Sequence, residues 1–256
     1  MVNNMSENKN TYYGDLASFI YNLSKPPGTS IDGDIEFYTN ELIQYEGPVL
    51  EAGVGNGRMA IPLLRKGVDV FGIDNSLEMI ELYKTNLLKY NLEANVQLAD
   101  LNNLKLTQKF ENIILPNGSF CSLKREYSKN ILTSFLNLLQ NNGKLYIDLI
   151  YPNSFKAGID HEYNFKIEND KFIKIKNSSI SINWIEQSTF SVLKYDLMID
   201  NKSVQQEIQN FKLYWYGVDE FEKLLLSIGF KNIKQIINYN NKKMLNLKTL
   251  TFIAEK

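Results

Sequence analysis

The sequence predicts an α/β fold: a Rossmann-like, doubly wound, mostly parallel seven-stranded sheet with an antiparallel β insertion before the last helix and strands. Two observations carry this prediction. Between residues 47 and 152, short apolar runs alternate with stretches of helical periodicity, which is typical of parallel strands covered by helices. Between about residues 161 and 214, apolar and polar side chains alternate with a period of two, which favours antiparallel strands.

Helices precede the sheet along the chain. Residues 11–23 carry aromatic and aliphatic side chains at helical spacing, and a Lys-Pro-Pro-Gly segment at 25–28 ends this helix. A second helix is expected from residue 33 or 34 to about residue 45. Gly47-Pro48 then separates it from a buried strand at 49–52.

The parallel sheet follows from the alternation of the next segments. Helices are expected at residues 58–66, 77–90, 127–139 and 218–227. Further strands are expected at residues 68–73, 96–99, 110–115 and 144–149, and a closing pair of strands ends at residues 250–254. Ser76 is a predicted N-cap, and Gly229 a predicted helix stop.

Period-two stretches after Pro152 predict the insertion. They cover residues 172–176, 180–184 and 195–199, and a turn at 200–202 precedes another extended run that ends near Tyr216.

The composition sets limits on function. A chain of 256 residues that is 44% hydrophobic can bury its own core. Its net charge of -1 provides no overall positive field, so no nucleic-acid partner is expected. The polar N-terminus, the absence of a long apolar run and the single cysteine, Cys121, lead us to expect a cytoplasmic protein without a membrane partner.

A glycine-rich turn follows the strand at 49–52, with the sequence Glu51-Ala52-Gly53-Val54-Gly55-Asn56-Gly57. Such a turn lets backbone N–H groups approach a ligand closely, because glycine has no Cβ. The dinucleotide fingerprint G-x-G-x-x-G requires its third glycine at position 58, where this chain has Arg58. That difference disfavours a nicotinamide dinucleotide site.

Two acidic residues, Asp74 and Asp100, end the next two predicted strands. Asp74 lies roughly 20 residues after the turn, where a carboxylate can accept hydrogen bonds from both hydroxyls of a ribose. Either acid alone could be a helix cap or a turn residue. Their placement at the ends of successive strands favours a shared ligand site.

The turn and the acids together resemble the motifs of class I S-adenosylmethionine-dependent methyltransferases. The resemblance covers about residues 12–151 and resumes at the closing helix and strands. It implies S-adenosyl-L-methionine as cofactor, S-adenosyl-L-homocysteine as product, Asp74 at the ribose and Asp100 at the adenine. The cofactor-binding residues that it implies are Tyr13, Glu51, Ala52, Gly53, Gly55, Arg58, Asp74, Asn75, Met79, Asp100, Leu101 and Asn117. For Met79, a place in the core is the alternative.

The insertion resembles that of small-molecule N-methyltransferases of the glycine and amino-sugar type. This resemblance implies an N-terminal helical lid segment (1–46), a cofactor-binding α/β domain (47–152 and 215–256) and an antiparallel roof over the acceptor (153–214). Within the lid, Tyr13 is the best match for a tyrosine near the methyl group or the cofactor carboxylate. A few of the roof's aromatic residues are expected in the pocket, from among Tyr163, Phe165, Trp184, Phe190, Tyr214, Trp215 and Tyr216.

No catalytic residue can be assigned, because methyl transfer from a sulfonium depends mainly on alignment and exclusion of water. The candidates are Tyr13, Asn117 and His161, and for His161 an exposed or merely hydrogen-bonded histidine is the alternative. Cys121 follows Phe120 instead of a proline and is expected to be a buried apolar residue. No residue cluster has metal-ligand spacing.

The leading hypothesis is methyl transfer to an amine nitrogen of a small molecule or short peptide: an amino sugar, an amino acid or a peptide amino terminus. The alternatives are O-methylation of a small molecule, a nicotinamide dinucleotide-dependent oxidoreductase, and a binding protein that keeps the fold without turnover. The sequence leaves a homo-oligomer open.

Overall fold

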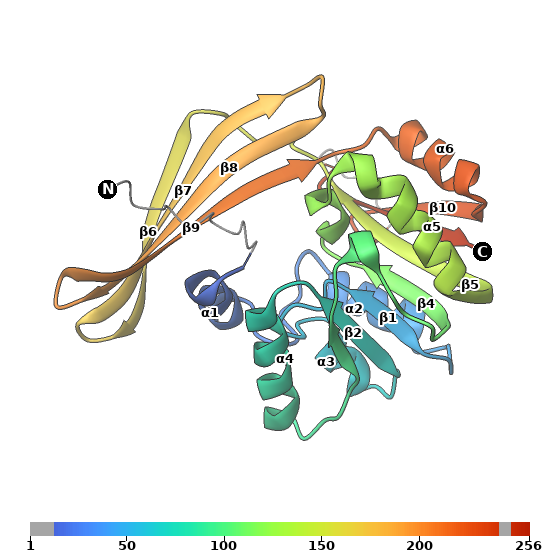
Figure 1. Cartoon of the computed structure of the whole chain (residues 1–256), viewed down its shortest axis with the longest axis horizontal. Coiled ribbons are helices and arrows are strands. Elements are labelled where there is room, and N and C mark those ends of the chain that lie inside the picture. Colours follow the sequence, from blue (N-terminus) through green and yellow to red (C-terminus); the bar gives the residue numbers. More distant parts are fainter. Residues whose placement is uncertain (1–12, 241–246) are drawn as a thin grey trace, which may run out of the picture.

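The structure is a computed structural model that describes residues 13–240 and 247–256. Its helices (Figure 1) are α1 (Asp15–Ser24), α2 (Asp34–Leu42), α3 (Ala60–Leu64), α4 (Leu77–Lys89), α5 (Ser128–Leu138) and α6 (Val218–Ile228), with 3₁₀ turns that include η1 (Leu101–Asn103) and η2 (Ser119–Ser122). Its strands are β1 (Val49–Ala52), β2 (Val70–Asp74), β3 (Val96–Leu98), β4 (Phe110–Leu115), β5 (Leu139–Ile150), β6 (Ile159–Glu168), β7 (Lys171–Asn183), β8 (Ser188–Ile199), β9 (Lys202–Tyr214), β10 (Lys231–Ile237) and β11 (Thr249–Glu255). Within the described ranges, no helix is long and apolar enough to cross a bilayer.

Among the described strands, the larger sheet has seven in the order β10-β11-β5-β4-β1-β2-β3, and β11 runs antiparallel to the other six. From β1 the chain adds β2 and β3 on one side, and then β4 and β5 on the other. The strand order therefore reverses between β1 and β4, and in open α/β sheets the carboxyl ends at such a point border the ligand crevice. The predicted fold class is confirmed.

Apolar side chains on both faces of this sheet form its core. Along β1, Val49 packs in a cluster with α2, α3 and α4, whereas Leu50 packs in a cluster with α5 and α6. This alternation explains why the strands read as continuous apolar runs. The helix ends also follow the sequence: Ser76 Oγ accepts from Met79 N–H (3.1 Å), and Gly229 ends α6 in the left-handed conformation.

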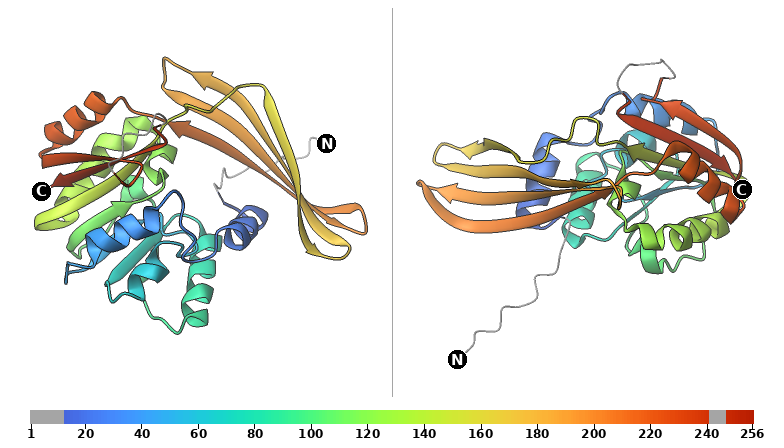
Figure 2. Two further views of the ribbon diagram at one scale, coloured as in Figure 1. Left: turned by 180° about the vertical axis from the view of Figure 1, so that it is seen from behind. Right: turned by 90° about the horizontal axis from the view of Figure 1, so that it is seen from above.

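The smaller sheet is antiparallel, in the order β6-β7-β8-β9, and it arches away from the main sheet above α1 (Figures 1 and 2). The period-two stretches at 172–176 and 180–184 lie in the single strand β7, apart from Trp184, which follows its end. A register shift between Ser179 and Ser181 reverses which side chains face the main domain, so the pattern restarts without a turn. We call this sheet the roof.

Helix α1 lies against the inner face of the roof. Its buried residues Leu16, Ala17 and Ile20 pack with Ile173 and with other roof residues. The predicted helix 11–23 starts later in the structure, at Asp15, and Tyr12 lies outside the described residues. The sequence therefore identified the helix, but its partner surface depends on tertiary packing.

Candidate functional site

The glycine turn between β1 and α3 opens toward the carboxyl edge of the sheet. A Cβ built on Gly55 would meet no atom within 4 Å, and its φ of +55° is in the left-handed region. Gly57 has another role, because a Cβ there would lie 2.3 Å from the ring of Tyr83 on α4. One glycine thus leaves room for a ligand, and the other lets the helix pack closely.

Asp74, at the end of β2, is tied to the glycine turn. Its Oδ2 accepts from Gly55 N–H (2.9 Å), and its Oδ1 accepts from Ser76 N–H (2.9 Å). Burial raises the pKa of Asp74, and hydrogen bonds from backbone N–H groups, with Ser76 and Gly55 among the donors, counteract part of this rise. The carboxylate is therefore held in one orientation beside the open turn.

Glu51, on β1, is 2% exposed. Its Oε2 has no hydrogen-bond partner within the part of the chain that the structure describes. Burial raises its pKa well above the usual range, although Arg58 acts in the opposite direction. A buried acceptor without a donor is costly, so this position suits a ligand that brings an ammonium or hydroxyl group.

Four further residues that the motifs predict at the cofactor follow the carboxyl ends of β2 and β3: Asn75, Met79, Asp100 and Leu101. Asp100 is exposed and accepts from Asn102 N–H (2.9 Å), so it is the N-cap of η1. Leu101 is half-buried, Asn75 is exposed and Met79 is 2% exposed. Because β1, β2 and β3 are adjacent and parallel, Glu51, Asp74 and Asp100 all belong to one edge of the sheet.

Arg58 is occupied by contacts within the protein. Its guanidinium forms an ion pair with Asp34 at the start of α2 (2.6 Å) and donates to the carbonyl of Thr29 (2.8 Å). The neighbouring Asn56 donates to Asn22 Oδ1 on α1 (2.9 Å). These contacts join the N-terminal helices to the glycine turn.

Tyr13 precedes α1 and lies at the same region. Its carbonyl accepts from Ser76 Oγ (3.0 Å), and its ring contacts that of Tyr21 edge-on at 5.5 Å. Burial raises its pKa, with Tyr21, Tyr195 and Asp74 adding to the rise. The phenol therefore stays protonated near the Asp74 carboxylate.

The loop after β4 completes this edge of the sheet. Asn117 has a φ of +55°, and its N–H donates to Asp148 Oδ2 on β5 (2.6 Å). Ser119 Oγ would lie 3.4 Å from a Cβ built on Gly53. The loop therefore lies next to the glycine turn.

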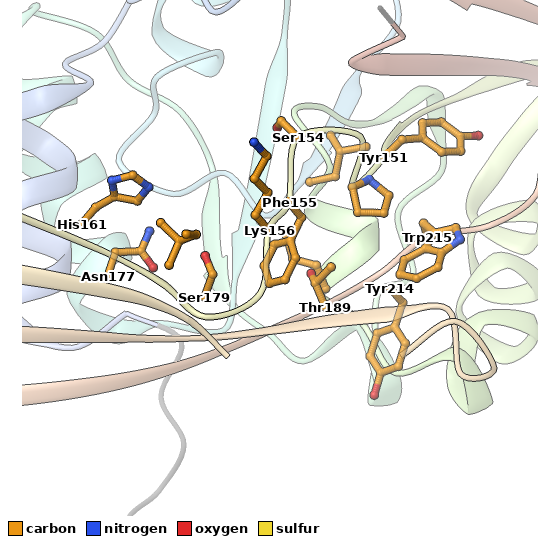
Figure 3. A pocket seen from close by; sticks show the side chains of 14 residues that line it. Tyr151, Ser154, Phe155, Lys156, His161, Asn177, Ser179, Thr189, Tyr214 and Trp215 are labelled. Carbon is orange, nitrogen blue, oxygen red and sulfur yellow. The ribbon is translucent and has the colours of Figure 1, made fainter. Parts of the chain in front are cut away.

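A cavity of about 770 Å³ lies between the carboxyl end of β5 and the roof (Figure 3). Its walls are formed by Ile150, Tyr151, Pro152, Ser154, Phe155, Lys156, Ile159, His161, Asn177, Ser179, Thr189, Leu213, Tyr214 and Trp215. His161 and Asn177 lie side by side near one end, and Trp215 and Tyr151 lie near the other (Figure 3). Among the described residues, Lys156 is the one Lys or Arg that lines the cavity, and no Asp or Glu lines it.

The aromatic residues of the roof segment have different surroundings. Tyr214 and Trp215 line the cavity, whereas Phe165 packs with the α1 cluster and Tyr216 with the main core. Trp184 is exposed at the β7–β8 turn. This agrees with the expectation that only a few would reach the pocket.

The sequence motifs do not indicate Asn177, which lines the cavity, or Asp148. Asn177 follows Ile173 and Ile175 on the inner face of β7, and its Oδ1 is buried without a partner in the described residues. The period-two pattern predicts an apolar side chain at position 177, so the polar Asn177 was the signal in the sequence. Asp148 was missed too, although it is the only acidic residue of strand β5.

The geometry fits an amino-acid nucleoside such as S-adenosylmethionine, since an open turn and a partnerless buried acid adjoin carboxylates at successive strand ends. Residues 49–143 match a family model described as a methyltransferase domain. No curated protein sequence matches the chain.

Solved structures share the fold at low identity. An S-adenosylmethionine-dependent methyltransferase from Clostridium acetobutylicum has a TM-score of 0.73 at 16% identity, over 93% of this chain and 96% of that one. The CcbJ methyltransferase from Streptomyces caelestis has 0.73 at 18%, over 96% and 98%. The sugar N-methyltransferase KedS8 from Streptoalloteichus sp. has 0.73 at 15%, over 99% of each chain. Residues 49–143 therefore match a methyltransferase domain, and the chain shares the fold of the S-adenosylmethionine-dependent methyltransferases.

Proposed function

We propose that this protein transfers a methyl group from S-adenosylmethionine to an amine nitrogen of a small molecule, such as an amino sugar, an amino acid or a peptide amino terminus. The observation that carries the proposal is the position of the cavity beside the loop that follows β4. Its wall residue Ile150 would lie 2.8 Å from a Cβ built on Gly118, in the loop that adjoins the glycine turn. Acceptor space and cofactor turn are thus on opposite sides of one short loop.

The cofactor would supply an electrophilic methyl carbon, and the sulfur would keep the electron pair of the broken carbon–sulfur bond. The acceptor supplies the lone pair for the new bond, and an amine must then lose a proton. The residues that would hold the cofactor are those of the turn and strand ends: Glu51 at the ammonium, Asp74 at the ribose and Asp100 at the adenine. Their role is to orient and to exclude water.

The wall composition favours an acceptor amine that is neutral when it reacts, because the described lining contains Lys156 and no carboxylate. Trp215 and Tyr214 provide aromatic surface, and aromatic faces attract a nitrogen that gains positive charge during transfer. His161, the one histidine of the sequence, lies on the cavity wall, and its imidazole is the candidate to take the released proton. Asn117 and Tyr13, the other candidates, lie on the cofactor side.

The test starts with calorimetry of the full chain against S-adenosylhomocysteine and NAD. We expect binding of the first and none of the second. Radiolabelled S-adenosylmethionine is then offered with matched acceptors that differ only in an amine or hydroxyl at one carbon, drawn from amino sugars, amino acids and peptides.

Methylation of the amine member of a pair supports the proposal, and His161→Gln should lower its kcat more than its KM. Methylation of only the hydroxyl member would replace it with the O-methyltransferase alternative. Binding of NAD in preference to S-adenosylhomocysteine would overturn the cofactor assignment.

A further inference from the structure

Asp148 is a fully buried carboxylate at the centre of the fold. Its Oδ1 accepts from the hydroxyls of Tyr38 (2.9 Å) and Thr251 (2.6 Å). Its Oδ2 accepts from the hydroxyl of Tyr239 (2.7 Å) and from the backbone N–H of Asn117 (2.6 Å). An ionised carboxylate has about four acceptor positions, so these donors fill them.

Three of these donors differ from the fourth. The hydroxyls of Tyr38, Tyr239 and Thr251 can rotate and can also accept a hydrogen bond. The N–H of Asn117 can only donate, and it belongs to a peptide in an unusual conformation. Asn117 has a φ of +55° and is followed by Gly118 at +74°.

A non-glycine residue in the left-handed region persists where its surroundings hold it. The contact with Asp148 is short and charge-assisted, which makes it one of the stronger hydrogen bonds available to a backbone N–H. It points the Asn117 N–H into the protein. The loop is thereby pinned to β5 at the residue where it turns.

The same turn contacts both halves of the site. Ser119 on one side lies against Gly53 of the cofactor turn, and Ile150 on the other side lines the cavity and lies against Gly118. A shift of the Asn117 peptide would move both contacts. Tyr38 and Thr251 belong to α2 and β11, outside this loop.

We propose that Asp148 is a positioning residue of the methyl-transfer site, which acts through the Asn117 N–H to fix the loop between cofactor and acceptor. It does not touch either ligand. The inference rests on the proposed cofactor site. It assigns a role to a carboxylate at a position where a buried strand ordinarily has an apolar residue.

The experiment compares Asp148→Ala, Asp148→Asn and Thr251→Val in the full chain. Asp148→Ala should weaken S-adenosylhomocysteine binding by roughly tenfold, as expected when the loop loses its strongest anchor. Asp148→Asn should restore most of the affinity, because its Oδ1 can face Asn117 while its amide N–H₂ donates to the hydroxyls. Thr251→Val removes a donor from the same carboxylate and should lower the unfolding temperature without changing affinity.

A second measurement needs neither turnover nor ligand. In the unaltered protein, the Asn117 amide proton should resonate downfield and exchange slowly, and it should move upfield in Asp148→Asn because the charge is lost. The same resonance should stay in place in Thr251→Val. This arm applies even if Asp148→Ala fails to fold.

Equal loss of affinity in Asp148→Ala and Thr251→Val would reduce Asp148 to a structural residue and overturn the proposal. So would an Asn117 resonance that is identical in the unaltered protein and in Asp148→Asn. A failure of the unaltered protein to bind S-adenosylhomocysteine would instead count against the proposed function, and the amide measurement would still test the anchor.

Discussion

The carboxylate of Glu207, on roof strand β9, accepts a hydrogen bond from the backbone N–H of Leu16 (2.7 Å) at the start of α1. Its other oxygen accepts from Gly14 N–H (3.1 Å). The first N–H groups of a helix have no partner within the helix, and a carboxylate there also suits the helix dipole. The roof therefore supplies the cap of α1, while Asn22 near the other end bonds to Asn56 of the glycine turn.

Glu207→Ala should loosen α1. Loss of an N-terminal cap costs about 1 kcal/mol, and the amides of α1 should exchange faster with solvent. Glu168→Ala, an exposed change of the same charge on β6, is the matched control. Hydrogen exchange of α1 that is equally slow in both variants would show that apolar packing alone holds the helix.

Asp74→Ala should weaken S-adenosylhomocysteine binding by about 1–3 kcal/mol, because charge-assisted hydrogen bonds to the ribose would be lost. Asp69→Ala is the control, since Asp69 is exposed and precedes the same strand at its opposite end. Calorimetry measures both. Unchanged affinity in a folded Asp74→Ala protein would remove Asp74 from the cofactor site.

Glu51→Gln should stabilise the ligand-free protein and weaken cofactor binding. The folded protein holds the proton of Glu51 to higher pH than the unfolded chain, whose ordinary pKa is 4.5. Stability of the unaltered protein therefore falls as pH rises above that value, and the glutamine variant lacks this fall.

The free energy of unfolding of the variant should thus exceed that of the unaltered protein by an amount that grows from pH 5 to pH 8, toward about 1–3 kcal/mol. Thermal unfolding at several pH values measures it. A constant difference across this range would mean that Glu51 has a partner in the folded protein.

The secondary structure could be predicted because its signals are local. Val49–Ala52 is a continuous apolar run apart from Glu51, and Ser76 precedes a helix that its side chain does cap. The register shift within β7 is also visible in the sequence, because the apolar residues change from odd to even positions there. The period of the pattern alone does not distinguish a bulge from a turn.

The contacts around the site could not be predicted in the same way. The hydroxyls that meet Asp148 come from residues 110, 103 and 91 positions away, so no local pattern links them. Arg58 was assigned to the cofactor from its motif position, and its ion pair with Asp34 joins segments that only the fold brings together. Motifs locate the edge of the sheet, whereas tertiary packing decides what each side chain does there.

The last prediction concerns Tyr13 and the lid. The phenol lies near Asp74, and the backbone of Tyr13 is bound to Ser76, so the residue can add a hydrogen bond to a ligand held by Asp74. Tyr13→Phe removes only the hydroxyl and should weaken S-adenosylhomocysteine binding by about 0.5–1.5 kcal/mol. Tyr21→Phe is the control for loss of a neighbouring phenol. Deletion of residues 1–23 should weaken binding more than Tyr13→Phe does and should strongly reduce turnover. The deletion exposes the cofactor turn to water and removes the hydrogen bond between Asn56 and Asn22. If the deleted protein remains folded and keeps the affinity and rate of the full chain, α1 is a packing element of the roof and not a lid.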